Sequence, residues 1–75
     1  MRIIERENGE PIKWRCHHFT IEKYFIENIN RYAYGVSSFN ENECYHYFSD
    51  LKQAEKWCKT NDVKEVERIW KSRKQ

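Results

Sequence analysis

Glycine and proline are scarce in this sequence, which holds only Gly9, Gly35 and Pro11 among its 75 residues. A loop that cradles phosphate through its backbone N–H groups needs several glycines close together, so two isolated glycines exclude such a loop. No low-complexity tract and no linker rich in glycine or proline divides the chain. We therefore expect residues 1–75 to form a single small domain.

Long hydrophobic runs are also absent. The first ten residues, MRIIERENGE, lack the apolar core of a secretory signal, and no segment approaches the ~20 apolar residues of a membrane helix. We therefore expect a cytoplasmic protein without membrane contact. Three cysteines, Cys16, Cys44 and Cys58, cannot all pair within one chain, which excludes a complete disulfide framework. In a reducing compartment they are expected to behave as small buried hydrophobic residues.

An excess of one charge is missing as well. Fourteen Lys and Arg oppose twelve Asp and Glu, and a net charge of +2 does not by itself predict nucleic-acid binding. The basic last five residues, KSRKQ, are expected to form a solvated, frayed terminus. Aromatic residues, by contrast, are abundant. Three Trp, five Tyr and four Phe supply much of the apolar surface from which a short chain can build a core.

The N-terminal half predicts strands. Asn8-Gly9 is a turn signal because both residues tolerate a positive φ, so residues 2–15 read as a β-hairpin. In the strand expected over 12–18, apolar and polar residues alternate, with Ile12, Trp14 and Cys16 on one face and Lys13, Arg15 and His17 on the other. Residues 20–29 fit a helix or a strand. Their β-branched and aromatic residues favour a strand over 19–27 that turns at 28–30.

The second half contains two more expected strands, 31–38 and 44–48, joined by polar turn residues 39–43. The clearest element is a helix over about 50–59, because Asp50 and Gln53 have the spacing of a capping box. Its buried stripe is expected to consist of Leu51, Ala54, Trp57 and Cys58.

Residues 63–71 are consistent with either a strand or a second helix. Asp62 and Glu65 form another capping-box pattern, but alternation and three β-branched residues favour a final edge strand. The expected fold class is α+β: a small antiparallel β-meander of four or five strands with one helix packed on one face, followed by the ambiguous segment 63–71.

The motif Cys-x-His occurs twice, at Cys16–His18 and at Cys44–His46. If strands 12–18 and 44–48 were neighbours, these four side chains could converge on zinc, which prefers thiolate and imidazole ligands. Structural zinc sites usually separate paired ligands by two to four residues, whereas here one residue intervenes. We therefore assign no metal ligand and no cofactor, and a zinc-binding domain is only the third possibility.

Catalysis is not expected either. Cys–His and His–His mechanisms need a carboxylate that orients the histidine or a site that binds an anion, and the sequence shows neither. A chain of this length also leaves little room for a substrate pocket of about 300 Å³ or more that is surrounded by a packed core. We therefore expect a protein that is not an enzyme.

Binding to another macromolecule remains the main expectation. The sequence is rich in Tyr, Trp and Arg, the residue types that dominate protein interfaces. We predict an accessory or inhibitor protein, of the kind that phages and mobile elements encode, that binds a protein and that could form a homodimer through an edge strand. The predicted partner-binding residues are Lys13, Arg15, His17, Arg31, Trp70, Lys71 and Arg73.

The alternative is a nucleic-acid-binding module. Its basic residues would be Lys13, Arg15 and Arg31 together with the basic tail, and Tyr32 or Tyr34 would stack on bases from the same sheet face.

Overall fold

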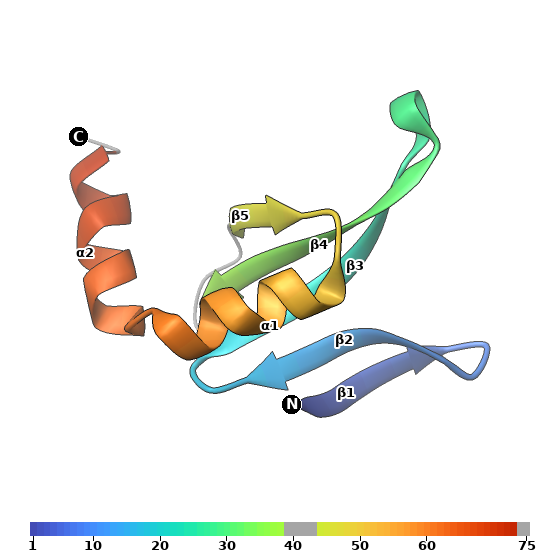
Figure 1. Ribbon diagram of the computed structural model, residues 1–75, viewed down its shortest axis with the longest axis horizontal. Coiled ribbons are helices and arrows are strands. Elements are labelled where there is room, and N and C mark those ends of the chain that lie inside the picture. Colours follow the sequence, from blue (N-terminus) through green and yellow to red (C-terminus); the bar gives the residue numbers. More distant parts are fainter. Residues whose placement is uncertain (39–43, 74–75) are drawn as a thin grey trace.

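Five antiparallel strands lie side by side in chain order and form a single sheet, with two helices after them (Figure 1). The structure, a computed structural model, describes residues 1–38 and 44–73. The strands are β1 (Arg2–Glu7), β2 (Glu10–Cys16), β3 (Phe19–Ile26), β4 (Arg31–Ser38) and β5 (Cys44–Phe48), and the helices are α1 (Leu51–Thr60) and α2 (Val63–Arg73). The expected α+β meander is confirmed. The polar turn expected at 39–43 lies outside the described residues.

Two-residue turns close the first two hairpins. Asn8 and Gly9 both have positive φ, 52° and 83°, which matches the type I′ turn expected from this pair. The strand expected over 12–18 ends at Cys16, and His17 and His18 form the next turn, with His17 at φ 58°. The prediction that His17 shares a strand face with Lys13 and Arg15 is therefore wrong.

The reason for this early turn lies in the core. Cys16 is paired with Phe19 across the turn, and paired residues of neighbouring strands point to the same side of the sheet. Both side chains are almost completely buried. A strand continued to residue 18 would remove Phe19 from that position.

The ambiguous segment 20–29 is mostly strand, as its composition favoured. β3 is hydrogen-bonded on both sides, to β2 and to β4, so its backbone groups are satisfied without a helix. A short 3₁₀ turn, η1 (Glu27–Ile29), follows, and Asn30 leaves it in the left-handed region with φ 52°. The turn expected at 28–30 is thus confirmed.

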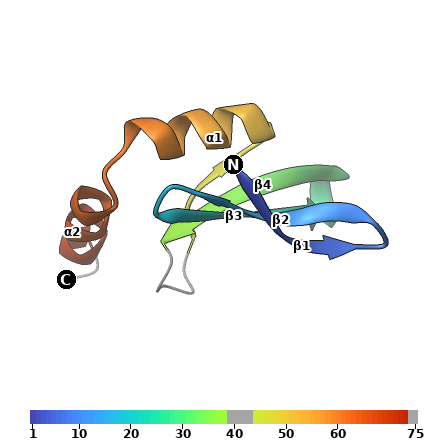
Figure 2. The ribbon, with the colours of Figure 1, turned by 90° about the horizontal axis from the view of Figure 1, so that it is seen from below.

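Helix α1 covers one face of the sheet, which we call the helix face (Figure 2). The core lies between them and is formed by Trp14, Cys16, Phe19, Ile21 and Val36 from the sheet and by Ala54 and Cys58 from α1. The side chain of Asp50 accepts hydrogen bonds from the backbone N–H groups of Lys52 (2.6 Å) and Gln53 (3.4 Å) and so caps the helix, as expected. We call the opposite face of the sheet the open face.

The preference for a strand over 63–71 is wrong, because Val63–Arg73 forms the helix α2. Asp62 caps this helix by accepting hydrogen bonds from the backbone N–H groups of Lys64 (2.8 Å) and Glu65 (3.3 Å). Helical spacing also brings Val63 and Val66 to one side, where both pack against the core. A strand would point these two valines to opposite faces. Neither helix is long and apolar enough to cross a membrane.

Candidate binding surface

The two edge strands of the sheet differ in charge. Four of the six residues of β1 are charged, and its pairing with β2 is irregular around Glu5. Charges and irregular pairing are common devices that keep an edge from pairing with another chain. β5, with the sequence CYHYF, carries no Asp, Glu, Lys or Arg, and within residues 1–38 and 44–73 no strand lies beside its outer edge. β5 therefore lacks the charges that protect β1, although its pairing with β4 is also irregular, between Val36 and Ser37.

A β-bulge determines which way the side chains of β5 point. Val36 of β4 pairs with His46 and Ser37 pairs with Cys44, so Tyr45 is an extra residue between the two pairs. Such a bulge turns two successive side chains toward the same side. Consistent with this, the Tyr45 ring contacts the ring of Phe19 in the core, with centroids 6.5 Å apart, and so lies on the helix face.

The bulge brings two aromatic rings of β5 against the helices. The Tyr45 ring meets Trp70 of α2 edge-on, with ring centroids 5.3 Å apart. The His46 ring is nearly parallel to that of Trp57 in α1, at 6.3 Å and 10°. Both helices are thus joined to the edge strand through aromatic contacts, which stabilise beyond the area that they bury.

A groove of about 260 Å³ lies where β5, α1 and α2 meet. We call it the aromatic groove, and its walls include Tyr45, His46, Trp57, Ile69, Trp70 and Arg73. Ile69 is 41% exposed, so an apolar side chain faces solvent beside these rings. The volume suits one or two side chains of a partner better than a whole small-molecule ligand.

The seven predicted partner-binding residues lie on different surfaces. Trp70 and Arg73 belong to the aromatic groove, and Lys71 is exposed on the same helix. Lys13 and Arg15 lie on the open face of β2, on the other side of the sheet from α1. The remaining two belong to neither surface. His17 lies in the β2–β3 turn, and Arg31 is the first residue of β4.

Sequence reasoning missed Tyr45, His46 and Trp57 as groove residues. Their directions depend on the bulge in β5 and on where α2 packs, and no local pattern of one sequence reports either. The uncharged composition of CYHYF was the one available signal, because unprotected edge strands lack charge.

The open face carries an ion pair and an aromatic pair. Lys13 Nζ lies 3.8 Å from Glu22 Oε2, and the rings of Tyr24 and Tyr47 meet with centroids 6.0 Å apart. The Tyr24 hydroxyl donates a hydrogen bond to Glu22 (3.2 Å). Partial burial, followed by the charge of Glu22, raises the pKa of Tyr24 to about 12. Gly35 lies beneath these rings, where a Cβ would come within 2.9 Å of Tyr24.

The tyrosines proposed to stack on nucleic-acid bases do not share this face. Tyr34 packs against Trp14 on the helix face, with ring centroids 5.9 Å apart. Tyr32, two residues before Tyr34 on β4, points to the same helix face and contacts Phe25, while Lys23 Nζ lies 4.3 Å from the Tyr32 ring centroid. The expected face that combines Lys13 and Arg15 with Tyr32 or Tyr34 is therefore wrong, because the sheet separates the two groups.

The proposed zinc ligands do not converge. β3 and β4 lie between β2 and β5, so the strands that carry the two Cys-x-His motifs are not neighbours. Cys16 Sγ lies 3.9 Å from the carbonyl oxygen of Glu55 on the helix face, whereas Cys44 Sγ lies on the open face near Gly35. Among the described residues, no three His, Cys, Asp or Glu side chains are grouped as metal ligands would be.

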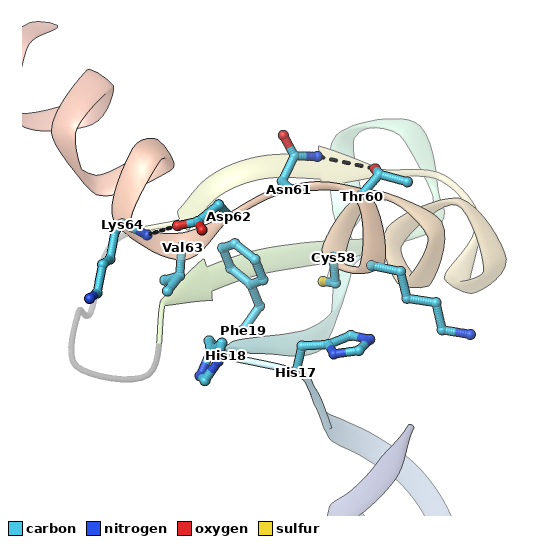
Figure 3. Close-up of a pocket in the computed structure, with 10 residues that line it drawn as sticks. His17, His18, Phe19, Cys58, Thr60, Asn61, Asp62, Val63 and Lys64 are labelled. Carbon is cyan, nitrogen blue, oxygen red and sulfur yellow. Dashed lines mark hydrogen bonds between the residues drawn. The ribbon is translucent and has the colours of Figure 1, made fainter.

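A second hollow lies between the β2–β3 turn and the junction of α1 with α2 (Figure 3). Its volume is about 550 Å³, but it is open to solvent, so it does not contradict the expectation that this short chain leaves little room for a substrate pocket surrounded by a packed core. We call it the histidine cleft, because His17 and His18 form one of its walls. It opens to solvent instead of being enclosed by the core, which explains how a small domain can contain it.

Comparison of the chain with protein-family models, with curated proteins and with solved structures finds no significant match.

Proposed function

We propose that this protein is a non-enzymatic binding protein that takes a segment of another protein as an additional strand along β5. The observation that carries the proposal is an uncharged edge strand beside a groove with aromatic walls. In strand addition, backbone hydrogen bonds supply affinity, and pockets beside the edge select side chains. The edge of β5 would supply the backbone hydrogen bonds, and the aromatic groove would select the side chains.

The residues of the aromatic groove indicate which side chains of the partner it would bind. Trp, Tyr and Arg are the residues most enriched at interface hot spots, and Trp57, Tyr45, Trp70 and Arg73 all line this groove. An apolar side chain of the partner would fill the space between the rings. A carboxylate next to it would meet Arg73, and Lys71 adds positive charge to the same last turn of α2.

We place this activity in the cytoplasm and regard the chain as an accessory or inhibitor protein of the phage or mobile-element type. The support is its small single fold together with three free thiols, Cys16, Cys44 and Cys58. Free thiols suit a reducing compartment.

Two isoleucines of equal exposure allow a matched test. Ile69 in the groove is 41% exposed and Ile3 on the β1 edge is 40% exposed, so Ile69→Glu and Ile3→Glu introduce the same charge at similar cost to the fold. Tagged wild-type and variant proteins are used to capture partners from cells that express the protein. We expect Ile69→Glu to abolish capture of a specific protein and Ile3→Glu to retain it. Equal capture by both variants would contradict the proposal.

Amide hydrogen exchange locates the contact in the captured complex. Strand addition should slow exchange in β5, while exchange in β1 should not change. Capture of nucleic acid, released steeply as salt rises, would instead favour the alternative module and overturn the proposal. A second copy of this chain as the partner would appear as a dimer in size-exclusion chromatography.

A further inference from the structure

A row of aligned side chains crosses the open face of the sheet from β1 to β4. In the strand register, Arg2 pairs with Arg15, Arg15 with Thr20, and Thr20 with Ser37. Paired residues point to the same side of the sheet, and their Cβ atoms lie about 4.5–5.5 Å apart. We call these four residues the arginine row. Figure 2 shows α1 on the other side of the sheet, so this helix does not cover the row.

The hydrogen-bond donors of the arginine row are accessible. Arg2 is exposed, and the other three residues are half-buried. Within residues 1–38 and 44–73, the side chains of Arg2, Thr20 and Ser37 make no hydrogen bond or ion pair. Arg15 has an interaction within the fold, but a guanidinium carries five N–H donors and can serve several acceptors.

The first two members of the row carry the same charge. Arg2 and Arg15 lie directly opposite each other, and cross-strand pairs of like charge destabilise a sheet. An anion bound by both guanidiniums would offset this repulsion, and the planar fork of a guanidinium matches a phosphate group. The hydroxyl groups of Thr20 and Ser37 can donate hydrogen bonds to the remaining oxygens of the same anion. The arginine row therefore complements a phosphate group.

Carboxylates limit this basic surface to the two arginines. Beside them on the open face, Lys13 lies between Glu5 and Glu22 in the strand register, and its Nζ lies 3.8 Å from Glu22 Oε2. The backbone of a nucleic acid carries many phosphates and would have to pass these two carboxylates. A single phosphate monoester carries a charge of about −1.5 to −2, which two guanidiniums balance. The charges thus favour one phosphorylated group over a polyanion.

We propose that the arginine row binds a phosphate monoester carried on a side chain of a partner protein. Tyr24 and Tyr47, which are 40% and 57% exposed, meet each other on the same face and extend the surface beyond the row. Their rings contact the residues beside the phosphorylated one, which a free phosphate lacks. The aromatic groove lies on the other side of the sheet, so failure of this site would leave the proposed function untouched.

Pools of short peptides with random flanking residues test this recognition without a known partner. Pools with a central phosphoserine, phosphothreonine or phosphotyrosine are titrated against ¹⁵N-labelled protein, beside the same pools without phosphate, inorganic phosphate and oligouridylate. We expect saturable amide shifts at the four residues of the arginine row with at least one phosphorylated pool, and the tightest pool identifies the modified residue. No saturation there, equal affinity for the unmodified pools, or tighter binding of inorganic phosphate or oligouridylate would each overturn the proposal.

Matched variants test the residues. Arg2→Gln removes a guanidinium and Thr20→Val replaces a hydroxyl by a methyl group. We expect each to weaken binding of the best pool about tenfold, as the loss of a hydrogen bond to a charged group does. Arg6→Gln removes the same charge near the other end of β1, where Arg6 pairs with Pro11, and should bind normally. Normal binding by Arg2→Gln, or equal weakening by Arg6→Gln, would overturn the site. Melting temperatures confirm that each variant folds, and Ile69→Glu in the aromatic groove should still bind the phosphorylated pool.

Discussion

The indole ring of Trp70 lies edge-on against the phenol ring of Tyr45, with ring centroids 5.3 Å apart and ring planes at 71°. This contact joins α2 to β5, while Val63 and Val66 pack the beginning of the helix against the core. One side of the aromatic groove therefore depends on a contact between two residues, Tyr45 and Trp70, that are more than twenty positions apart in the chain.

The first prediction concerns this attachment of α2. Trp70→Ala removes the aromatic pair, and we expect the free energy of unfolding to fall by about 0.5–1.5 kcal/mol or somewhat more. Hydrogen exchange should become faster in α2 but not in β3 or β4, because the sheet core is unchanged. Ile69→Ala, at the exposed neighbouring position, is the control and should change stability by less than about 0.5 kcal/mol. Equal effects of the two variants would contradict the role of Trp70.

The second prediction compares two isoleucines. Ile21 is completely buried between the sheet and α1, whereas Ile29 in the 3₁₀ turn is 60% exposed. Ile21→Ala leaves a cavity and should cost about 2–5 kcal/mol, a large part of the stability of a small domain. Ile29→Ala should cost less than about 0.5 kcal/mol. Urea denaturation measures both, and a small loss for Ile21→Ala would place the core elsewhere.

The third prediction concerns two turn residues with opposite expected effects. His17 and Gly9 both have positive φ, 58° and 83°. His17→Gly relieves strain and should raise the free energy of unfolding by up to about 1 kcal/mol after the entropy of glycine is included. Gly9→Ala introduces strain without a clash and should lower it by about 1 kcal/mol. Thermal unfolding gives the signs, and a destabilised His17→Gly would show that the turn needs the imidazole.

The fourth prediction concerns alkaline pH. Burial, followed by the charge of Cys16, raises the pKa of Cys58 from 9.0 to about 12. The unfolded chain therefore loses this proton at lower pH than the folded protein. The contribution of Cys58 to stability is complete below about pH 9 and is lost as pH rises toward 12. Tyr24, whose pKa is raised to about 12, acts in the same direction.

Cys58→Ala isolates the thiol. The variant is less stable at every pH because it leaves a cavity, but its free energy of unfolding should fall less steeply than that of wild type between about pH 9 and 11. Denaturant titrations at several pH values give the two slopes. Parallel slopes would show that the Cys58 thiol ionises as easily in the folded protein as in the unfolded chain.

Most of the fold follows from signals that lie within a few residues of each other. Asn8-Gly9 determines the first turn because both residues adopt positive φ, and the values are 52° and 83°. Alternation along residues 31–38 predicts β4. The capping residue Asp50 and the apolar stripe predict α1 and the side that it buries.

The candidate sites depend on contacts between distant segments. Cys16 and Phe19 must both reach the core, so the strand ends two residues early and His17 becomes a turn residue at the cleft. The bulge in β5 turns the Tyr45 ring toward the helix face, where it contacts Trp70. Local sterics and periodicity thus predicted the five strands and α1 from the sequence alone, but left residues 63–71 open between a strand and a helix. Tertiary packing decided where strands end, which edge stays open and which side chains meet, because those choices depend on burying residues that are far apart in the chain.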